Sequence, residues 1–484
     1  MEEVEIASIK HKTTVSVVFL SLRNIGIQAI STIGFFLLTI LLGAGEVGLF
    51  AIVAESVAIL GYFSDVGLAS ALIQKKQPIT IPELRTTFLI QQVLVLIALA
   101  AVALIYPNIS QSKGYGLAEM SILISLCYAF FVASLKTIPS VQLERKLDFK
   151  LLSTIDIIEN TSFYFFAVLF ALMGYGVYSY AFATVIRSTL GLILIYRFSP
   201  WPIGIGFSIE ATRGLFKYGI PFQLNSLIAM TKDRLSSLLV AGIIGRESFG
   251  ILSWAQKGPR IPLSFMDAIM RVTFPTFSRI QDEKELLKRS VEKSLYYISL
   301  FIFPSLAGIA MIAPDIINVI PRYTKWSPAI IPLYFFAFSF AIAAVTTPLT
   351  NAFNAIGKIT ITTKLMIMWT VLTWIFYPIL SFKYGYIGTS IAAAIVGSSS
   401  FIVWYIADKL LSIQTLKTIS QPLISSLFMV IILTSINFLH LSPLLNIILK
   451  IITGTTFYLT YSYLFSRKEI SWFLEQIKCL LIKK

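Results

Sequence analysis

The chain has 484 residues, of which 56% are hydrophobic and only 13% are charged, and its mean hydropathy is +0.81. Ordinary soluble domains carry about 25% charged residues. Two histidines and two cysteines leave little material for metal, thiol or imidazole chemistry, and the net charge of +15 is not gathered on one polar domain. The composition therefore excludes a soluble enzyme, a nucleic-acid-binding protein and a disulfide-stapled scaffold.

Apolar runs long enough to cross a bilayer follow one another along the whole chain. A spanning helix needs about 20 apolar residues, and long runs without strict alternation predict helices rather than strands. We therefore predict an all-α polytopic membrane protein with about 14 transmembrane helices. Their expected ranges are 15–42, 46–73, 86–106, 119–139, 151–173, 177–196, 218–244, 248–274, 290–312, 328–352, 365–382, 386–407, 419–439 and 442–465.

The basic residues of the connecting segments indicate the orientation. Segments on the same side as the N-terminus hold 24 Lys and Arg residues, whereas those on the opposite side hold 5. Cytoplasmic loops carry the excess of basic residues, so both termini are predicted to be cytoplasmic. The first apolar run is too long for a cleavable signal peptide, and none is expected. The tail is either an interfacial helix or a solubilised end, and the sequence leaves both open.

The chain also resembles itself. Residues 42–48 match residues 244–250 at an offset of 202, and residues 106–109 match residues 313–316 at an offset of 207. Pro139 matches Pro348, and residues 175–176 match residues 384–385, both at an offset of 209. Glycines of these landmarks are expected in tight turns, and prolines at span ends or breaks. We predict two parallel six-helix lobes, 15–198 and 218–408, joined by a cytoplasmic linker 199–217 and followed by two helices in 419–465 and an amphipathic cytoplasmic tail 466–484. Duplicated bundles around a central cavity are characteristic of alternating-access transporters.

Charged residues inside the predicted spans supply the candidate site. On span 248–274, polar residues recur every three or four positions and share one face of a helix, beside a kink expected at Gly258, Pro259 and Pro262. A central Arg or Lys costs about 2.5–3.5 kcal/mol on insertion scales, so such residues usually face protein or water. The candidate substrate-binding residues of this basic cavity are Arg23, Lys232, Arg234, Lys257, Arg260 and Arg271. An internal Asp267–Arg271 ion pair and a self-neutralising cluster at 232–234 stay open as alternatives.

Acidic residues in the spans have two open interpretations. They are candidates to bind a coupling H⁺ or Na⁺, or to form ion pairs, for example Asp156 and Glu159 with Arg23 or Arg187. The acidic candidates are Glu55, Asp65, Asp156, Glu159, Asp233 and Asp267. Basic residues near span ends are expected to snorkel to the interface; these are Lys136, Arg187, Lys293 and Lys450. No catalytic residue, metal site or cofactor is expected.

Two stretches carry a resemblance to a known family. Residues 42–50, followed by 64–74, and residues 142–149, ahead of 174–178, resemble the signatures of Wzx-type polysaccharide-export flippases. This branch, with its colanic-acid and teichuronic-acid exporter types, belongs to the multidrug/oligosaccharidyl-lipid/polysaccharide superfamily. The resemblance implies translocation of an undecaprenyl-pyrophosphate-linked oligosaccharide between leaflets of a prokaryotic inner membrane, coupled to an ion gradient, with glycan polymerase or assembly proteins as partners. The second lobe departs from the first-lobe signature at residues 267–270.

Three other functions are alternatives to this expectation. A multidrug or cation antiporter of the same superfamily would use a carboxylate in the first span, but residues 15–42 contain no Asp or Glu. A peptidoglycan-precursor flippase shares the fold and stays open. A membrane enzyme of glycan assembly would need a larger outer loop than the chain has.

Overall fold

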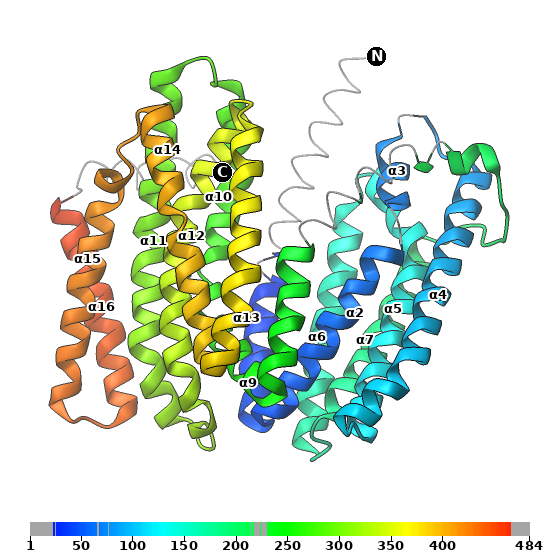
Figure 1. The fold of residues 1–484 in the computed structure, drawn as a ribbon, viewed down its shortest axis with the longest axis horizontal. Coiled ribbons are helices and arrows are strands. Elements are labelled where there is room, and N and C mark those ends of the chain that lie inside the picture. The colour runs from blue at the N-terminus through cyan, green and yellow to red at the C-terminus, as the bar shows by residue number, and fades with distance from the viewer. Residues whose placement is uncertain are drawn as a thin grey trace. The chain divides into compact units, whose positions relative to one another are not determined.

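The structure is a computed structural model that describes residues 23–24, 26–64, 67–75, 77–213, 215–216, 223 and 230–465. Every regular element in this part of the chain is a helix, and the prediction of an all-α polytopic membrane protein is confirmed (Figure 1). The predictions made for residues 15–22, for Asp65 and for the tail 466–484 lie outside the described residues.

Two compact units divide the chain, Met1–Gly250 and Ile251–Lys484. The first contains an apolar helix at Gly26–Leu41 and then α2 (Ala44–Ser64), α3 (Leu68–Gln74), α4 (Ile81–Lys113), α5 (Leu117–Arg145), α6 (Phe149–Leu172), α7 (Tyr178–Phe198), the π-helix η1 (Thr231–Leu235) and the first part of α9 (Ser236–Arg260). The second contains the end of α9 and then α10 (Leu263–Arg279), α11 (Lys284–Val319), η2 (Thr324–Ala329), α12 (Ile330–Ala355), α13 (Ile359–Ser398), α14 (Phe401–Leu411), α15 (Thr415–Ile436), η3 (Asn437–Leu439) and α16 (Pro443–Phe465). The predicted lobes and linker stay predictions.

Eleven helices among the described residues are long and apolar enough to cross a membrane. The shorter apolar helix Gly26–Leu41 coincides with the first predicted span. Two of the eleven contain a glycine in the left-handed region where two predicted spans adjoin, Gly245 (φ 79°) and Gly385 (φ 59°). All the predicted ranges therefore overlap described helices, while the count of 14 stays a prediction.

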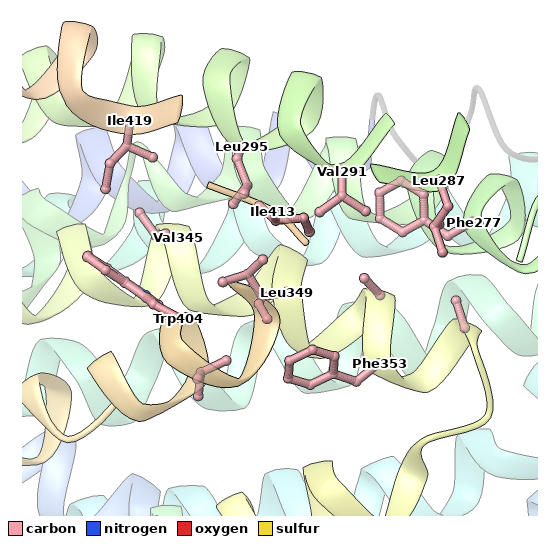
Figure 2. Packing of buried hydrophobic residues seen from close by; sticks show 14 of the residues in the cluster. Phe277, Leu287, Val291, Leu295, Val345, Leu349, Phe353, Trp404, Ile413 and Ile419 are labelled. Atoms are coloured by element: carbon pink, nitrogen blue, oxygen red, sulfur yellow. The ribbon is translucent and has the colours of Figure 1, made fainter. Parts of the chain in front are cut away.

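Helix α11 is the centre of the second unit and packs against α10, α12, α15 and α16. A buried cluster joins α10, α11, α12, α14 and α15, with Val291, Leu349 and Val403 at zero exposure. Figure 2 shows these side chains gathered between the helices, with Val345 and Leu349 near Trp404. In the first unit, α5 and α6 both pack against α7, and Phe50 stacks on Tyr180 with ring centroids 4.2 Å apart.

The repeat landmarks have matching local geometry. Helix α5 ends with Asp148 N donating to Leu143 O, and α12 ends with Lys358 N donating to Phe353 O, the same Schellman arrangement. Each of these two helix ends contains one residue in the left-handed conformation, Leu147 (φ 57°) after α5 and Gly357 (φ 75°) after α12. Gly176 (φ 54°) and Gly385 (φ 59°), matched at an offset of 209, also share this conformation.

The prolines do not behave as the sequence predicted. Pro107, Pro139, Pro314 and Pro348 lie inside α4, α5, α11 and α12 rather than at their ends. A proline frees the carbonyl four residues earlier, and membrane helices tolerate this when a neighbouring helix supplies a donor. Before Pro139, the carbonyl of Leu135 accepts a hydrogen bond from the Tyr196 hydroxyl at 2.9 Å. The helix therefore continues through the proline.

Candidate functional site

In the first unit the candidate acids are paired with bases from other helices. Arg23 Nε lies 3.1 Å from Asp156 Oδ2 of α6, and both side chains are about one-third exposed. Glu159, one turn further along α6, lies 2.6 Å from Lys136 Nζ of α5 and 3.8 Å from Arg187 Nε of α7. The expected pairings of Asp156 with Arg23 and of Glu159 with Arg187 are both present, and they join three helices around α6.

Glu159 is held tightly in this cluster. Its side chain is 8% exposed, and a Cβ on Gly191 of α7 would overlap its carboxylate. A buried carboxylate is stable only when it is paired and hydrogen-bonded, and Lys136 supplies that pairing. Lys136 is therefore not the interfacial anchor that the sequence predicted, because its ammonium group is directed at Glu159 rather than at the headgroups.

The remaining described candidate charges of the first unit lie on α2 and on the π-helix η1. Arg234 Nη1 lies 2.6 Å from Glu55 Oε2, which joins η1 to α2. Lys232 Nζ lies 3.2 Å from Asp233 Oδ1. The cluster at 232–234 is thus neutralised locally and through Glu55, so these two bases offer less free positive charge than the sequence suggested. Short π-helical segments are frequent at functional sites.

Arg145, from one of the signature stretches, binds backbone rather than a charged group. Its Nη1 donates to the carbonyls of Leu72 at 2.7 Å and Lys75 at 2.5 Å, and its Nη2 donates to Gln77 O at 2.9 Å. The last carbonyls of a helix have no intrahelical partner and attract cations. Arg145 therefore caps α3 and fixes it to the end of α5.

The predicted polar stripe of span 248–274 is divided between two helices. Helix α9 ends at Arg260 and α10 begins at Leu263, so the stripe bends at the expected kink instead of following one straight helix. Lys257 is half-buried and Arg260 is exposed at the end of α9. Pro259 and Pro262 cause the break, because neither has an amide hydrogen to continue the helical ladder.

Helix α10 has two contrasting faces. Met266 and Met270 are buried against Ile298 and Ile302 of α11 and against α12. Ser264, Asp267 and Arg271 are exposed on the opposite face, where no ion pair within 4.0 Å joins Asp267 to any other described side chain. Charged groups on a membrane helix face protein or water rather than acyl chains. This exposed face is the part of the candidate site where charged side chains of α10 reach the surface.

One buried pair was missed from the sequence. Lys450 of α16, 3% exposed, lies 2.5 Å from Asp315 Oδ2 of α11 and also donates to Met311 O at 3.1 Å. The sequence predicted a snorkelling lysine, but Lys450 is directed into the protein and fixes α16 to α11. The signal was Asp315 itself, an acid at a repeat landmark just beyond the predicted span 290–312, which the structure includes in α11.

Comparisons with known proteins agree with this architecture. The model of a family described as "Polysaccharide biosynthesis protein" matches residues 37–331. An uncharacterized membrane protein in the cps region of Klebsiella pneumoniae is 23% identical, covering 98% of this chain and 100% of the relative. The lipopolysaccharide biosynthesis protein WzxC of Escherichia coli (strain K12) is 24% identical, covering 84% of this chain and 81% of the relative.

A solved structure shows a similar fold. The lipid II flippase MurJ, in an inward closed conformation, superposes with a TM-score of 0.76 and 16% identity, covering 94% of this chain and 100% of MurJ. At this identity the likeness establishes the fold and nothing about the substrate. The resemblance to polysaccharide-export flippases expected from the sequence is confirmed by the family match and by the named relatives.

Proposed function

Because the chain belongs to the polysaccharide biosynthesis protein family, we propose that it moves an undecaprenyl-pyrophosphate-linked oligosaccharide from the cytoplasmic to the outer leaflet of a prokaryotic inner membrane. Alternating access accounts for the movement. The family and fold support the coarser assignment, a multi-pass polysaccharide transporter of the multidrug/oligosaccharidyl-lipid/polysaccharide superfamily. The finer assignment rests on the exposed charged face formed by Arg260, Ser264, Asp267 and Arg271.

The charge balance favours an anionic substrate. In the first unit Asp156, Glu159 and Glu55 each lie beside a base, so their charges are largely compensated. Arg260 and Arg271 are exposed on a face where Asp267 is the one acid of the stripe. Planar guanidinium groups bind phosphate oxygens in pairs, which suits a pyrophosphate. A cationic drug would meet two arginines there.

Ion coupling is the second part of the proposal. Asp156, Glu159, Glu55 and Asp233 are engaged in ion pairs, which favours a structural role for them in this conformation. Asp267 is exposed beside the basic groups, and it is the acid of the site that we propose binds a coupling H⁺ or Na⁺. Replacing Asp267 with Asn should then abolish the dependence of transport on an ion gradient.

The test of the substrate is translocation of a fluorescent polyprenyl-pyrophosphate oligosaccharide in proteoliposomes. Each charge-assisted hydrogen bond contributes about 1.5–3 kcal/mol, so the double variant Arg260→Ala, Arg271→Ala should bind the substrate at least about tenfold more weakly. The matched control is Lys364→Ala, Lys409→Ala, which removes two exposed charges elsewhere in the second unit. Equal transport by both double variants would contradict the role of the α10 face.

The same assay separates the alternative substrates. A lipid-linked peptidoglycan precursor and a cationic dye are offered in place of the oligosaccharide. Transport of the oligosaccharide alone supports the proposal. Transport of the precursor alone would move the substrate to peptidoglycan assembly, and gradient-driven efflux of the dye would indicate a multidrug antiporter.

A further inference from the structure

The connection after α7 exposes a row of large apolar side chains. Residues 201–208 have no regular secondary structure, and a short helical stretch follows at 209–213. Ile203, Ile205, Phe207 and Ile209 are 59%, 82%, 61% and 76% exposed. We call these four residues the apolar ridge. Single exposed apolar residues scattered over a water-facing surface are normal, whereas a group of them marks an interaction site. The four large apolar residues on this short connection form such a group.

Both ends of this connection are fixed to the first unit. Trp201 is buried, stacks edge-on with Phe88 of α4, and donates from Nε1 to the Tyr196 hydroxyl at 3.2 Å. Leu215, beyond the ridge, is buried in the same cluster as Trp201. The buried residues Trp201 and Leu215 therefore hold the two ends of the ridge in place, while the side chains of the ridge itself are exposed.

The inner side of the connection is built for close approach to α4. A Cβ on Gly204 would come within 2.6 Å of Arg85 Nε, and one on Gly206 within 3.3 Å of Arg85 Cβ. Ser208 N donates to the Thr86 hydroxyl at 3.0 Å. Small residues at 204, 206 and 208 thus face α4, and the alternation places the large apolar residues on the other side.

The ridge continues an apolar surface that already faces lipid. Val93 and Leu96, eight and eleven residues after Arg85, lie within about 80° of it around α4, and these two side chains are 46% and 57% exposed on a helix long enough to span the membrane. Ile81, at the start of α4, is also 50% exposed. In Figure 1 the connection after α7 lies beside the same end of α4. The ridge therefore lies beside the start of α4, at one end of this apolar surface.

Basic residues flank the ridge on both sides. Arg197 and Arg213 are exposed four residues before Trp201 and four residues after Ile209, and the predicted orientation places them at the cytoplasmic surface. An apolar stripe with flanking arginines fits the boundary between anionic headgroups and acyl chains. A soluble partner would instead bind a surface that is discontinuous with the lipid-facing side of α4.

We propose that the apolar ridge, Ile203, Ile205, Phe207 and Ile209, inserts into the headgroup boundary of the cytoplasmic leaflet and binds anionic phospholipid there, so that the connection after α7 is a membrane anchor rather than a solvated linker. This inference is independent of the transported substrate.

The test places a fluorescent label at single cysteines, with Cys127 and Cys479 replaced by alanine, in nanodiscs that contain phosphatidylglycerol. Ile205→Cys is compared with Leu96→Cys, in the middle of α4, and with Lys146→Cys, an exposed position in the turn after α5. The label at position 205 should be quenched most by a nitroxide near the headgroup, and iodide should quench it several-fold less than the label at 146. Equal iodide quenching at 205 and 146, without quenching by lipid nitroxides, would overturn the proposal.

The lipid preference has its own measurement. Brominated phosphatidylglycerol should quench the label at 205 more than brominated phosphatidylcholine at the same content, and Arg197→Gln with Arg213→Gln should remove the difference. Equal quenching by the two lipids in the parent protein would overturn the binding of anionic phospholipid. Because the labelled positions are exposed, these variants are expected to fold, and a monodisperse elution profile checks this.

Discussion

Two tyrosine hydroxyls repair the helices that prolines interrupt. Tyr196 donates to Leu135 O, four residues before Pro139, and Tyr458 donates to Leu300 O at 2.8 Å, four residues before Pro304. Both carbonyls lost their helical donor to a proline, and both receive one from another helix. This arrangement explains why α5 and α11 continue through their prolines, and it ties each helix to a neighbour.

Removing the Tyr458 hydroxyl should therefore be costly only while Pro304 is present. Tyr458→Phe leaves the buried carbonyl of Leu300 unpaired, which costs about 1–3 kcal/mol. In a Pro304→Ala background the amide of residue 304 can bond that carbonyl, so the same substitution should cost less. The measurement is thermal unfolding of the four proteins of the double-mutant cycle in detergent. Identical costs in the two backgrounds would contradict this account.

Gly48 and Gly250, which the repeat matches at an offset of 202, meet in the first unit. A Cβ on Gly48 would overlap Arg246 O, and one on Gly250 would overlap Ala44 O. Glycine at both positions lets α2 and α9 approach backbone to backbone, as small residues do between membrane helices. The two copies of one sequence landmark therefore form a contact with each other.

A methyl group at this crossing should force the helices apart. We expect Gly48→Ala to destabilise the protein by about 1–3 kcal/mol, the range found for overpacked positions. Gly61→Ala is the matched control on the same helix, because a Cβ there meets nothing within 4 Å, and alanine favours a helix by up to about 1 kcal/mol. Thermal unfolding checks both variants. A similar loss of stability for Gly61→Ala would contradict the prediction, because it would show that α2 tolerates substitution at neither position.

Among the elements, α10 combines an apolar face in the core with a charged face that is exposed. The hydrophobic periodicity of span 248–274 predicted the polar face, because its residues recur at helical spacing. The division into two helices and the burial of Met266 and Met270 depend on neighbours from α11 and α12, which no local pattern contains.

The charged face of α10 should be accessible to water. A hydrophilic thiol reagent should modify Ser264→Cys and Arg271→Cys in a protein whose own cysteines are replaced by alanine. Ile375→Cys, 45% exposed in the middle of the predicted span 365–382, is the control that should react slowly, because thiols are ionised in water and not in acyl chains. If positions 264 and 271 react no faster than position 375, the face lies in lipid and the proposed binding surface is wrong.

For the molecule as a whole, hydrophobicity predicted the positions of the helices because the bilayer fixes a length and a polarity for each span. Pairings between helices were predicted only where acid and base were both recognised, as for Arg23 with Asp156. Lys136 and Lys450 were misassigned because their partners, Glu159 and Asp315, belong to other helices. A buried lysine differs from a snorkelling one through its neighbours, which the order of residues does not give.

Orientation in the membrane is the remaining property of the whole molecule that sequence alone predicts. Helices α4, α5, α6 and α7 are joined by short turns, so successive helices run in opposite directions and the turns after α4 and α5 lie on opposite sides. Because 24 basic residues are predicted on the side of the turn after α5 and 5 on the other, that turn should be cytoplasmic. In intact cells, a membrane-impermeant maleimide should label Ser112→Cys, and Lys146→Cys only after permeabilisation. The reverse pattern would invert the orientation, and the direction of the proposed transport would have to be inverted with it.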